Sequence, residues 1–317
     1  KESSAASDVY KRQIQSRGKI AGANFPVTIN LEDGATLRSL KEGIAYLVPK
    51  LPIVRQRLTT EDKRPLVGDD KALRDLGVEK SCTLLVKDLG PQVSWRTVFV
   101  VEYLGPMIIH PLLFLIMPAF WEYMGTPFTI SPVQLAVFWM VMTHFAKREF
   151  ESVFVHRFSN ATMPLFNIFK NSAHYWLLSG VLLAVSVYSP SLSWESLEGT
   201  FQNRPTFLVP CIALWVAAEL GNFQSHIILM NLRPAGTRVR RIPYGGTFTL
   251  VSCPNYFYET VAWLAICIMT LAIGPFVFLV VSCVQMTLWA IKKHKAYKRE
   301  FGDQYPRNRK IMFPYIF

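Results

Sequence analysis

Six apolar segments occupy most of the chain beyond residue 98, and they constrain its fold more than any other feature. A helix needs about 20 residues to cross the hydrocarbon core of a bilayer, where its backbone polar groups must be satisfied internally. The sequence therefore predicts a multi-pass α-helical membrane protein with six transmembrane helices, or seven if one of the shorter segments is broken. The segments are 98–119, 130–146, 175–188, 207–220, 260–273 and 275–291.

Cationic residues gather on one side of this predicted topology. The chain carries a net charge of +12, and the excess lies after the second and fourth segments and in the C-terminal tail. Short cytoplasmic loops are enriched in Lys and Arg, so both termini are predicted to be cytosolic. The same placement makes membrane lipid the expected partner of the positive charge and argues against nucleic acid.

Residues 25–88 have the mixed pattern of a small soluble domain. Residues 25–31 alternate as a strand does, Glu32-Asp33-Gly34 is a turn signal, 37–48 has helical spacing, and 82–86 is a second strand run. This order is typical of a β-grasp and resembles a ubiquitin-like domain, which either docks on the membrane part or binds a partner. Residues 1–24 are predicted to be a disordered or non-native segment, and 96–317 a transmembrane domain with a cytosolic C-terminal tail.

Polar side chains are concentrated where the fifth apolar segment begins. The run Asn255-Tyr256-Phe257-Tyr258-Glu259 places a carboxamide, two phenols and a carboxylate there. Lipid cannot satisfy such groups, so they must face protein, water or a ligand. Further polar residues are expected on the same side, and Glu102 and Lys147 would offset each other's charge if the bundle brought them together. The remaining ones are His144, Arg148, Asn222 and His226.

Two interpretations of these residues stay open. Each polar group is either part of a functional site or a helix-packing hydrogen bond or snorkelling cation. The loop from Asn231 to Gly246 combines arginines with glycines, as a phosphate-binding loop does, but it also suits an anchor against anionic lipid. No G-x-G-x-x-G motif is present, and the six histidines lack H-x-x-x-H spacing, so neither a Rossmann site nor a metal site is predicted.

Three sequence blocks resemble one enzyme family. The first runs from Val155 to Ser159 with Met163-Pro164 and 167–171, the second from Leu232 to Gly236 with 252–256, and the third from His294 to the terminal Phe313-Pro314-Tyr315-Ile316-Phe317. Together they resemble the trans-2-enoyl-CoA reductases of very-long-chain fatty acid elongation. The C-terminal half also resembles the wider steroid 5α-reductase family, whose steroid-reducing members lack the ubiquitin-like domain.

This resemblance implies NADPH-dependent reduction of trans-2-enoyl-CoA to saturated acyl-CoA at the endoplasmic reticulum membrane. It implies Tyr256 as the proton donor. A nearby cation such as Lys147 would help this phenol to donate and recover its proton, and Glu102 would orient the pair. The implied cofactor-binding residues are Asn222, Arg233, Arg241, Asn255, Glu259 and Tyr297. The implied partners are a long-chain enoyl-CoA substrate, membrane lipid and other fatty acid elongation enzymes.

The chain differs from the steroid reductases at three positions, and alternative functions remain open. His226 and Trp289 stand where those enzymes have an acid and an arginine, and Phe145 replaces their active-site tyrosine, which argues against steroid chemistry. The alternatives are a steroid or polyprenol enone reductase, a non-catalytic membrane adaptor and a membrane methyltransferase.

Overall fold

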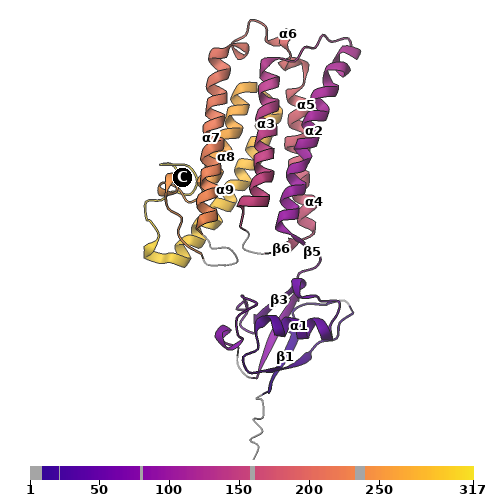
Figure 1. The fold of residues 1–317 in the computed structure, drawn as a ribbon, viewed down its shortest axis with the longest axis vertical. Coiled ribbons are helices and arrows are strands. Elements are labelled where there is room, and N and C mark those ends of the chain that lie inside the picture. Colours follow the sequence, from indigo (N-terminus) through magenta and orange to yellow (C-terminus); the bar gives the residue numbers. More distant parts are fainter. Residues whose placement is uncertain (1–8, 21, 79–80, 158–160, 233–239) are drawn as a thin grey trace, which may run out of the picture. The chain divides into compact units, whose positions relative to one another are not determined.

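The computed structural model describes residues 9–20, 22–78, 81–157, 161–232 and 240–317 (Figure 1). The chain divides into two compact units. One comprises Lys1–Ser94 with Thr162–Leu165, and the other Trp95–Ala161 with Phe166–Phe317.

The first unit is built on a four-stranded mixed sheet with the strand order β2-β1-β4-β3. The central strand β1 is antiparallel to β2 and parallel to β4, while β4 is antiparallel to β3. The strands are β1 (Val9–Ser16), β2 (Val27–Glu32), β3 (Gln56–Thr60) and β4 (Cys82–Asp88). A short pair, β5 (Gln92–Ser94) and β6 (Thr162–Pro164), is antiparallel.

Helix α1 (Leu37–Leu47) supplies the apolar layer that covers this sheet. It begins at Thr36, whose side chain accepts a hydrogen bond from the Ser39 backbone amide at 3.2 Å, so one of the helix's free amides is satisfied. Its buried residues, Leu37, Leu40 and Ile44, recur at helical spacing and join the core cluster that contains Ile14 of the sheet.

The structure corrects the prediction for residues 1–24. Val9–Ser16 forms a central strand with a partner on each side, so the expectation of disorder is wrong there, while residues 1–8 lie outside the described part of the chain. Arg12 and Ile14 share one face of β1, and both are buried. A buried arginine among apolar positions breaks the alternation that identifies a strand in a sequence.

A charged pair joins the end of β4 to the residue before β3. Arg55 Nε donates to Asp88 Oδ1 at 2.9 Å, and a second guanidinium nitrogen contacts the other carboxylate oxygen. The hydrogen bond from Arg55 lowers the pKa of Asp88 below its usual value. A lowered folded-state pKa stabilises the fold above the unfolded pKa of about 4, and this contribution is lost as the pH falls through the folded-state value.

The second unit is helical. Three of its helices, α2, α7 and an α9 segment extended to Gln304, are long and apolar enough to cross a membrane, among the residues described. The six predicted apolar segments overlap helical stretches of this unit. Its helices are α2 (Trp95–Tyr123), α3 (Pro132–Phe150), α4 (Phe166–Ala173), α5 (Leu183–Val187), α6 (Trp194–Leu197), α7 (Pro205–Asn231), α8 (Pro254–Thr270) and α9 (Ile273–Phe301), with π-helical turns η3 (Glu151–Val155) and η4 (His174–Leu182).

The long helices run side by side in a bundle (Figure 1). Helix α3 contacts α2, α7 and α8, so it lies where residues from several helices meet. A capping box fixes its start, because Ser131 and Gln134 satisfy each other's backbone amides at 3.2 and 3.0 Å. The apolar core of the bundle includes Phe145 and Trp263, both almost fully buried.

The position of Ile14 at the centre of the first unit generates a prediction. Replacing Ile14 with Ala should destabilise this sheet by about 2 to 5 kcal/mol, because a fully buried side chain leaves a cavity. Hydrogen exchange of the β2 and β4 amides in the full chain would then accelerate. Gln13→Ala, on the exposed face of the same strand, should leave exchange unchanged. Equal exchange in both variants would contradict the placement of β1 in the core.

Candidate active site

Three helices bring polar side chains together inside the bundle. Lys147 of α3 donates to Asn222 Oδ1 of α7 at 2.5 Å. The Asn222 amide nitrogen donates to the Asn255 backbone carbonyl at 2.9 Å and to Glu259 Oε2 at 3.2 Å, both on α8. Four of the residues singled out from the sequence are therefore joined by direct hydrogen bonds.

The close approach of α7 and α8 depends on Gly221. A Cβ atom at this position would lie 2.5 Å from the ring of Tyr258 on α8, far inside van der Waals contact. The Tyr258 hydroxyl is hydrogen-bonded to Thr247 Oγ1 at 2.6 Å, which holds the ring in place. Because Asn222 follows Gly221 directly, the glycine lets the amide reach Asn255 and Glu259 on the facing helix.

One acidic and one basic residue, Glu219 and His144, complete this cluster. Neither of them was given a specific role from the sequence. Glu219 of α7 lies 2.8 Å from the Lys147 ammonium and 2.7 Å from His144 Nδ1. The other ring nitrogen of His144 lies 3.2 Å from Glu259 Oε1. Glu219 precedes Asn222 by one helical turn within an apolar segment, and a carboxylate at that position was the signal that could have identified it.

Arg148 is the centre of a second set of contacts beside the first. Its guanidinium donates to the Tyr103 hydroxyl and to Glu151 Oε2, each at 2.8 Å. His226 Nδ1 lies 2.9 Å from the other Glu151 oxygen. Neither Tyr103 nor Glu151 was identified from the sequence, because each becomes relevant only through its contact with Arg148.

The expected pairing of Glu102 with Lys147 is wrong. Within the described residues, the ion-pair partners of Lys147 are Glu219 and Glu151. Glu102 is almost fully buried on α2, and its Oε2 atom has no hydrogen-bond partner there. The physical reason is geometric, since the rotation of α2 relative to α3 decides which residues meet and is not encoded by sequence spacing.

Tyr256 lies in the first turn of α8 and faces α9. Its ring centroid is 6.3 Å from that of Trp289. Burial of the Tyr256 phenol disfavours its charged form, and the positive charges of Lys293 on α9 and of Arg148 favour it. The cation expected to support this phenol was Lys147, whereas the structure directs the Lys147 ammonium to Glu219 and Asn222.

The other sequence-predicted cofactor residues lie apart from this cluster. Tyr297 stacks on Tyr305 with ring centroids 5.6 Å apart, close to the hydrogen-bonded pair of Ser252 Oγ and His294 Nδ1 at 2.6 Å. Arg241 is exposed, and Arg233 lies outside the described residues.

One buried acceptor in the cluster is available for a ligand. The side-chain oxygen of Asn255, a residue only 9% exposed, has no hydrogen-bond partner in the described structure. An unpaired buried carbonyl oxygen costs about 1 to 3 kcal/mol, and a ligand N–H or O–H group would recover it. A carboxamide or ribose hydroxyl of a nicotinamide cofactor carries such a donor, so the residues present fit that class of cofactor.

A metal ion fits the neighbouring residues less well. Ligand atoms of Glu151, His156 and His226 lie within 4.8 Å of one another. The carboxylate oxygens of Glu151 already face Arg148 at 2.8 Å and Lys147 at 3.5 Å. Two cations at those distances oppose a divalent ion by charge repulsion.

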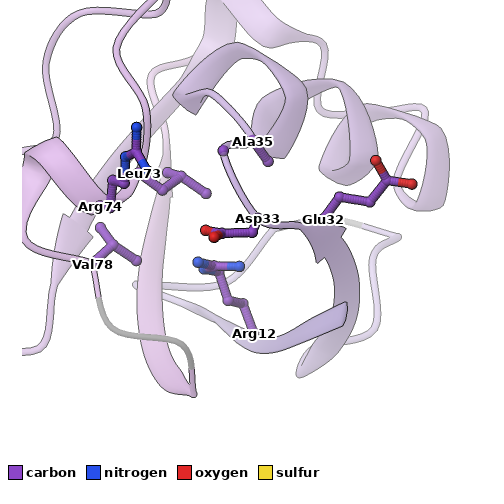
Figure 2. Close-up of a pocket in the computed structure, with 8 residues that line it drawn as sticks. Arg12, Glu32, Asp33, Ala35, Leu73, Arg74 and Val78 are labelled. Atoms are coloured by element: carbon purple, nitrogen blue, oxygen red, sulfur yellow. The ribbon is translucent and has the colours of Figure 1, made fainter. Parts of the chain in front are cut away.

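A separate cavity of about 230 Å³ lies in the first unit. Figure 2 shows the Arg12 side chain of β1 pointing toward Asp33, which lies in the turn between β2 and α1. The cavity contains none of the site residues predicted from the sequence.

Comparisons with known proteins show which family the chain resembles. Residues 161–317 match the family model described as 3-oxo-5-alpha-steroid 4-dehydrogenase. A Schizosaccharomyces pombe protein named for enoyl reductase activity is 45% identical over 96% of this chain and 98% of its own. The very-long-chain enoyl-CoA reductase of Dictyostelium discoideum is 38% identical over 79% of each chain, and the human trans-2,3-enoyl-CoA reductase-like protein is 30% identical over 89% of this chain and 77% of its own.

The fold and the comparisons define a membrane-bound oxidoreductase family that acts on carbon–carbon double bonds. Within it, the chain belongs to the very-long-chain enoyl-CoA reductases.

The glycine contact between α7 and α8 can be tested directly. Gly221→Ala should destabilise the protein by about 1 to 3 kcal/mol, because the added methyl group overlaps the Tyr258 ring. The thermal unfolding midpoint in detergent measures this. In a Tyr258→Leu background the same substitution should be neutral or stabilising, since alanine is the better helix former. Equal destabilisation in both backgrounds would show that the ring is not what the methyl group meets.

Proposed function

We propose that this chain reduces the α,β double bond of a trans-2-enoyl-CoA with NADPH, giving the saturated acyl-CoA. The observation that carries the proposal is the polar cluster of Lys147, Asn222, Asn255 and Glu259 in a chain of the very-long-chain enoyl-CoA reductase family. The two amides are buried and the two charged side chains are partly buried. A purely structural bundle gains little from burying so many charged groups, because their desolvation offsets their attraction.

Side chains on α7 and α8 are suited to hold the nicotinamide end of the cofactor. The Asn255 side-chain oxygen is an acceptor without a partner. The Glu259 carboxylate is held by Asn222 at one oxygen and by His144 at the other, and each carboxylate oxygen can accept a second hydrogen bond from a ligand. Arg233, Arg241 and Tyr297 are proposed to bind the rest of NADPH, with the arginines on its phosphates. Arginine binds phosphate oxygens through two parallel hydrogen bonds.

NADPH supplies the hydride that adds to the β carbon when it is bound. Tyr256 then gives its phenolic proton to the α carbon, which completes the reduction, and the phenolate recovers a proton from solvent. The charge of Lys293 stabilises that phenolate. The Lys147 ammonium acts through Asn222, to which it donates, and the role of Glu102 is to orient the substrate through its unpaired oxygen.

The setting of the reaction is proposed from the sequence. We propose that the chain lies in the endoplasmic reticulum membrane with six or seven spans and both termini cytosolic, supported by three membrane-length helices and the distribution of Lys and Arg. The sheet order and single packed helix of the first unit support a ubiquitin-like domain, now extended to begin at β1. Its exposed surface is proposed to contact membrane lipid or other elongation enzymes.

A steroid or polyprenol enone is the second candidate substrate. It is favoured by the match of residues 161–317 to the steroid dehydrogenase model. The hydride step is the same for either substrate, so the two proposals differ in the pocket that holds the apolar tail.

Tyr256→Phe tests the reaction and its proton donor together. Turnover of a long trans-2-enoyl-CoA, followed as NADPH oxidation by the purified protein, should fall by about 10²- to 10⁴-fold, the usual contribution of a general acid. NADPH affinity should change little, because only the hydroxyl is removed.

Two controls separate the alternatives. A steroid enone should give no turnover with the wild-type protein if the enoyl-CoA proposal holds. Tyr258→Phe, two residues away and also lacking one hydroxyl, should keep most of the activity. A folded wild-type protein without turnover on any of these substrates would favour the adaptor, and a fully active Tyr256→Phe would place the proton donor elsewhere.

A further inference from the structure

Five side chains from three helices form a closed ring of polar contacts. Starting at Glu259, the ring passes to His144 at 3.2 Å and from there to Glu219 at 2.7 Å. It continues from Glu219 to Lys147 at 2.8 Å and from Lys147 to Asn222 at 2.5 Å. Asn222 closes it by donating to Glu259 at 3.2 Å.

The donors and acceptors of this ring define its charges. Carboxylates only accept hydrogen bonds, and both ring nitrogens of His144 face carboxylate oxygens, so an imidazole that satisfies both must donate at both. His144 is then an imidazolium. With Lys147 positive and Glu219 and Glu259 negative, the ring contains two charges of each sign and is neutral as a whole.

His144 and Glu219 lie behind the residues that face the proposed cofactor. On α3, His144 comes one helical turn before Lys147, and on α7, Glu219 comes one turn before Asn222. Both are more than nine-tenths buried. Trp263, itself buried, lies against His144, with ring centroids 4.9 Å apart.

We propose that His144 and Glu219 are positioning residues that fix Glu259, Asn222 and Lys147 for cofactor binding. His144 holds one oxygen of Glu259, which leaves the other to Asn222. Glu219 holds the Lys147 ammonium, which in turn fixes the oxygen end of the Asn222 amide and so directs its NH₂ group toward α8. The inference rests on the proposed function, because it assigns these residues to the NADPH side of the site.

The test compares His144→Gln and Glu219→Gln with the wild-type full chain in detergent. Each substitution removes one charge from the neutral ring and weakens the contacts that the replaced residue makes to its two neighbours. The dissociation constant of NADPH, measured by fluorescence titration without substrate, should rise at least tenfold in both variants. The KM for enoyl-CoA should stay within about twofold. The double variant restores neutrality, and its loss should be close to that of either single variant, because residues of one network are not additive.

His110→Gln is the matched control. His110 is also a fully buried histidine with two hydrogen bonds, to the Tyr188 hydroxyl and the Ser179 carbonyl, each at 2.8 Å. It should lower the thermal midpoint without changing the NADPH dissociation constant. If Glu219→Gln does not fold, Glu219→Asp, which keeps the charge but shortens its reach, should still weaken NADPH binding.

The outcomes separate this inference from the function on which it rests. Wild-type NADPH affinity in the folded His144 and Glu219 variants would overturn the positioning role alone. If the NADPH dissociation constant rose no more in these variants than in His110→Gln, the positioning role would also be overturned, because such a rise would reflect a loss of stability alone. A folded wild-type protein that binds no NADPH would overturn the proposed function and this inference together.

Discussion

A carboxylate inside a membrane-spanning helix is costly unless its partners come from neighbouring helices, and this constraint orders the helical unit. Glu219 on α7 and Glu259 on α8 meet that requirement by sharing His144 of α3. Three helices must therefore keep a fixed rotation relative to one another, because a small shift of any one would leave a charge without a partner. Breaking a buried ionic contact by removing one member typically costs 3 to 5 kcal/mol.

The ring also explains why the helices approach so closely at this level. Side-chain hydrogen bonds of about 3 Å between helices require small residues beside them, and Gly221 provides this next to Asn222. Phe145 and Trp263 pack against the His144 ring, with centroid distances of 5.0 and 4.9 Å, and add apolar surface beside the charges. Excluding water there lowers the local dielectric constant, which strengthens the attraction within the ring and raises the cost of breaking it.

Much of the helical unit followed from local sequence patterns. The apolar segments overlap the helices found, and the polar run that opens α8 takes part in the buried cluster through Asn255 and Glu259. Features that depend on how helices or strands pack against one another were not predicted. Glu219 was overlooked, the pairing of Glu102 with Lys147 was wrong, and β1 was not recognised because its partners lie in β2 and β4 and its buried Arg12 conceals the strand pattern.

The ring is fixed in place before any ligand arrives. Glu219 and Glu259 each contact two ring members, and Glu219 Oε2 faces the Lys147 ammonium at 2.8 Å without a well-oriented hydrogen bond. Asn255 Oδ1 and Glu102 Oε2, both buried, have no partner among the described residues. Binding free energy is gained mainly where a buried group is unsatisfied before the ligand arrives. The ring therefore acts as rigid support, and these two oxygens mark where ligand donors gain most.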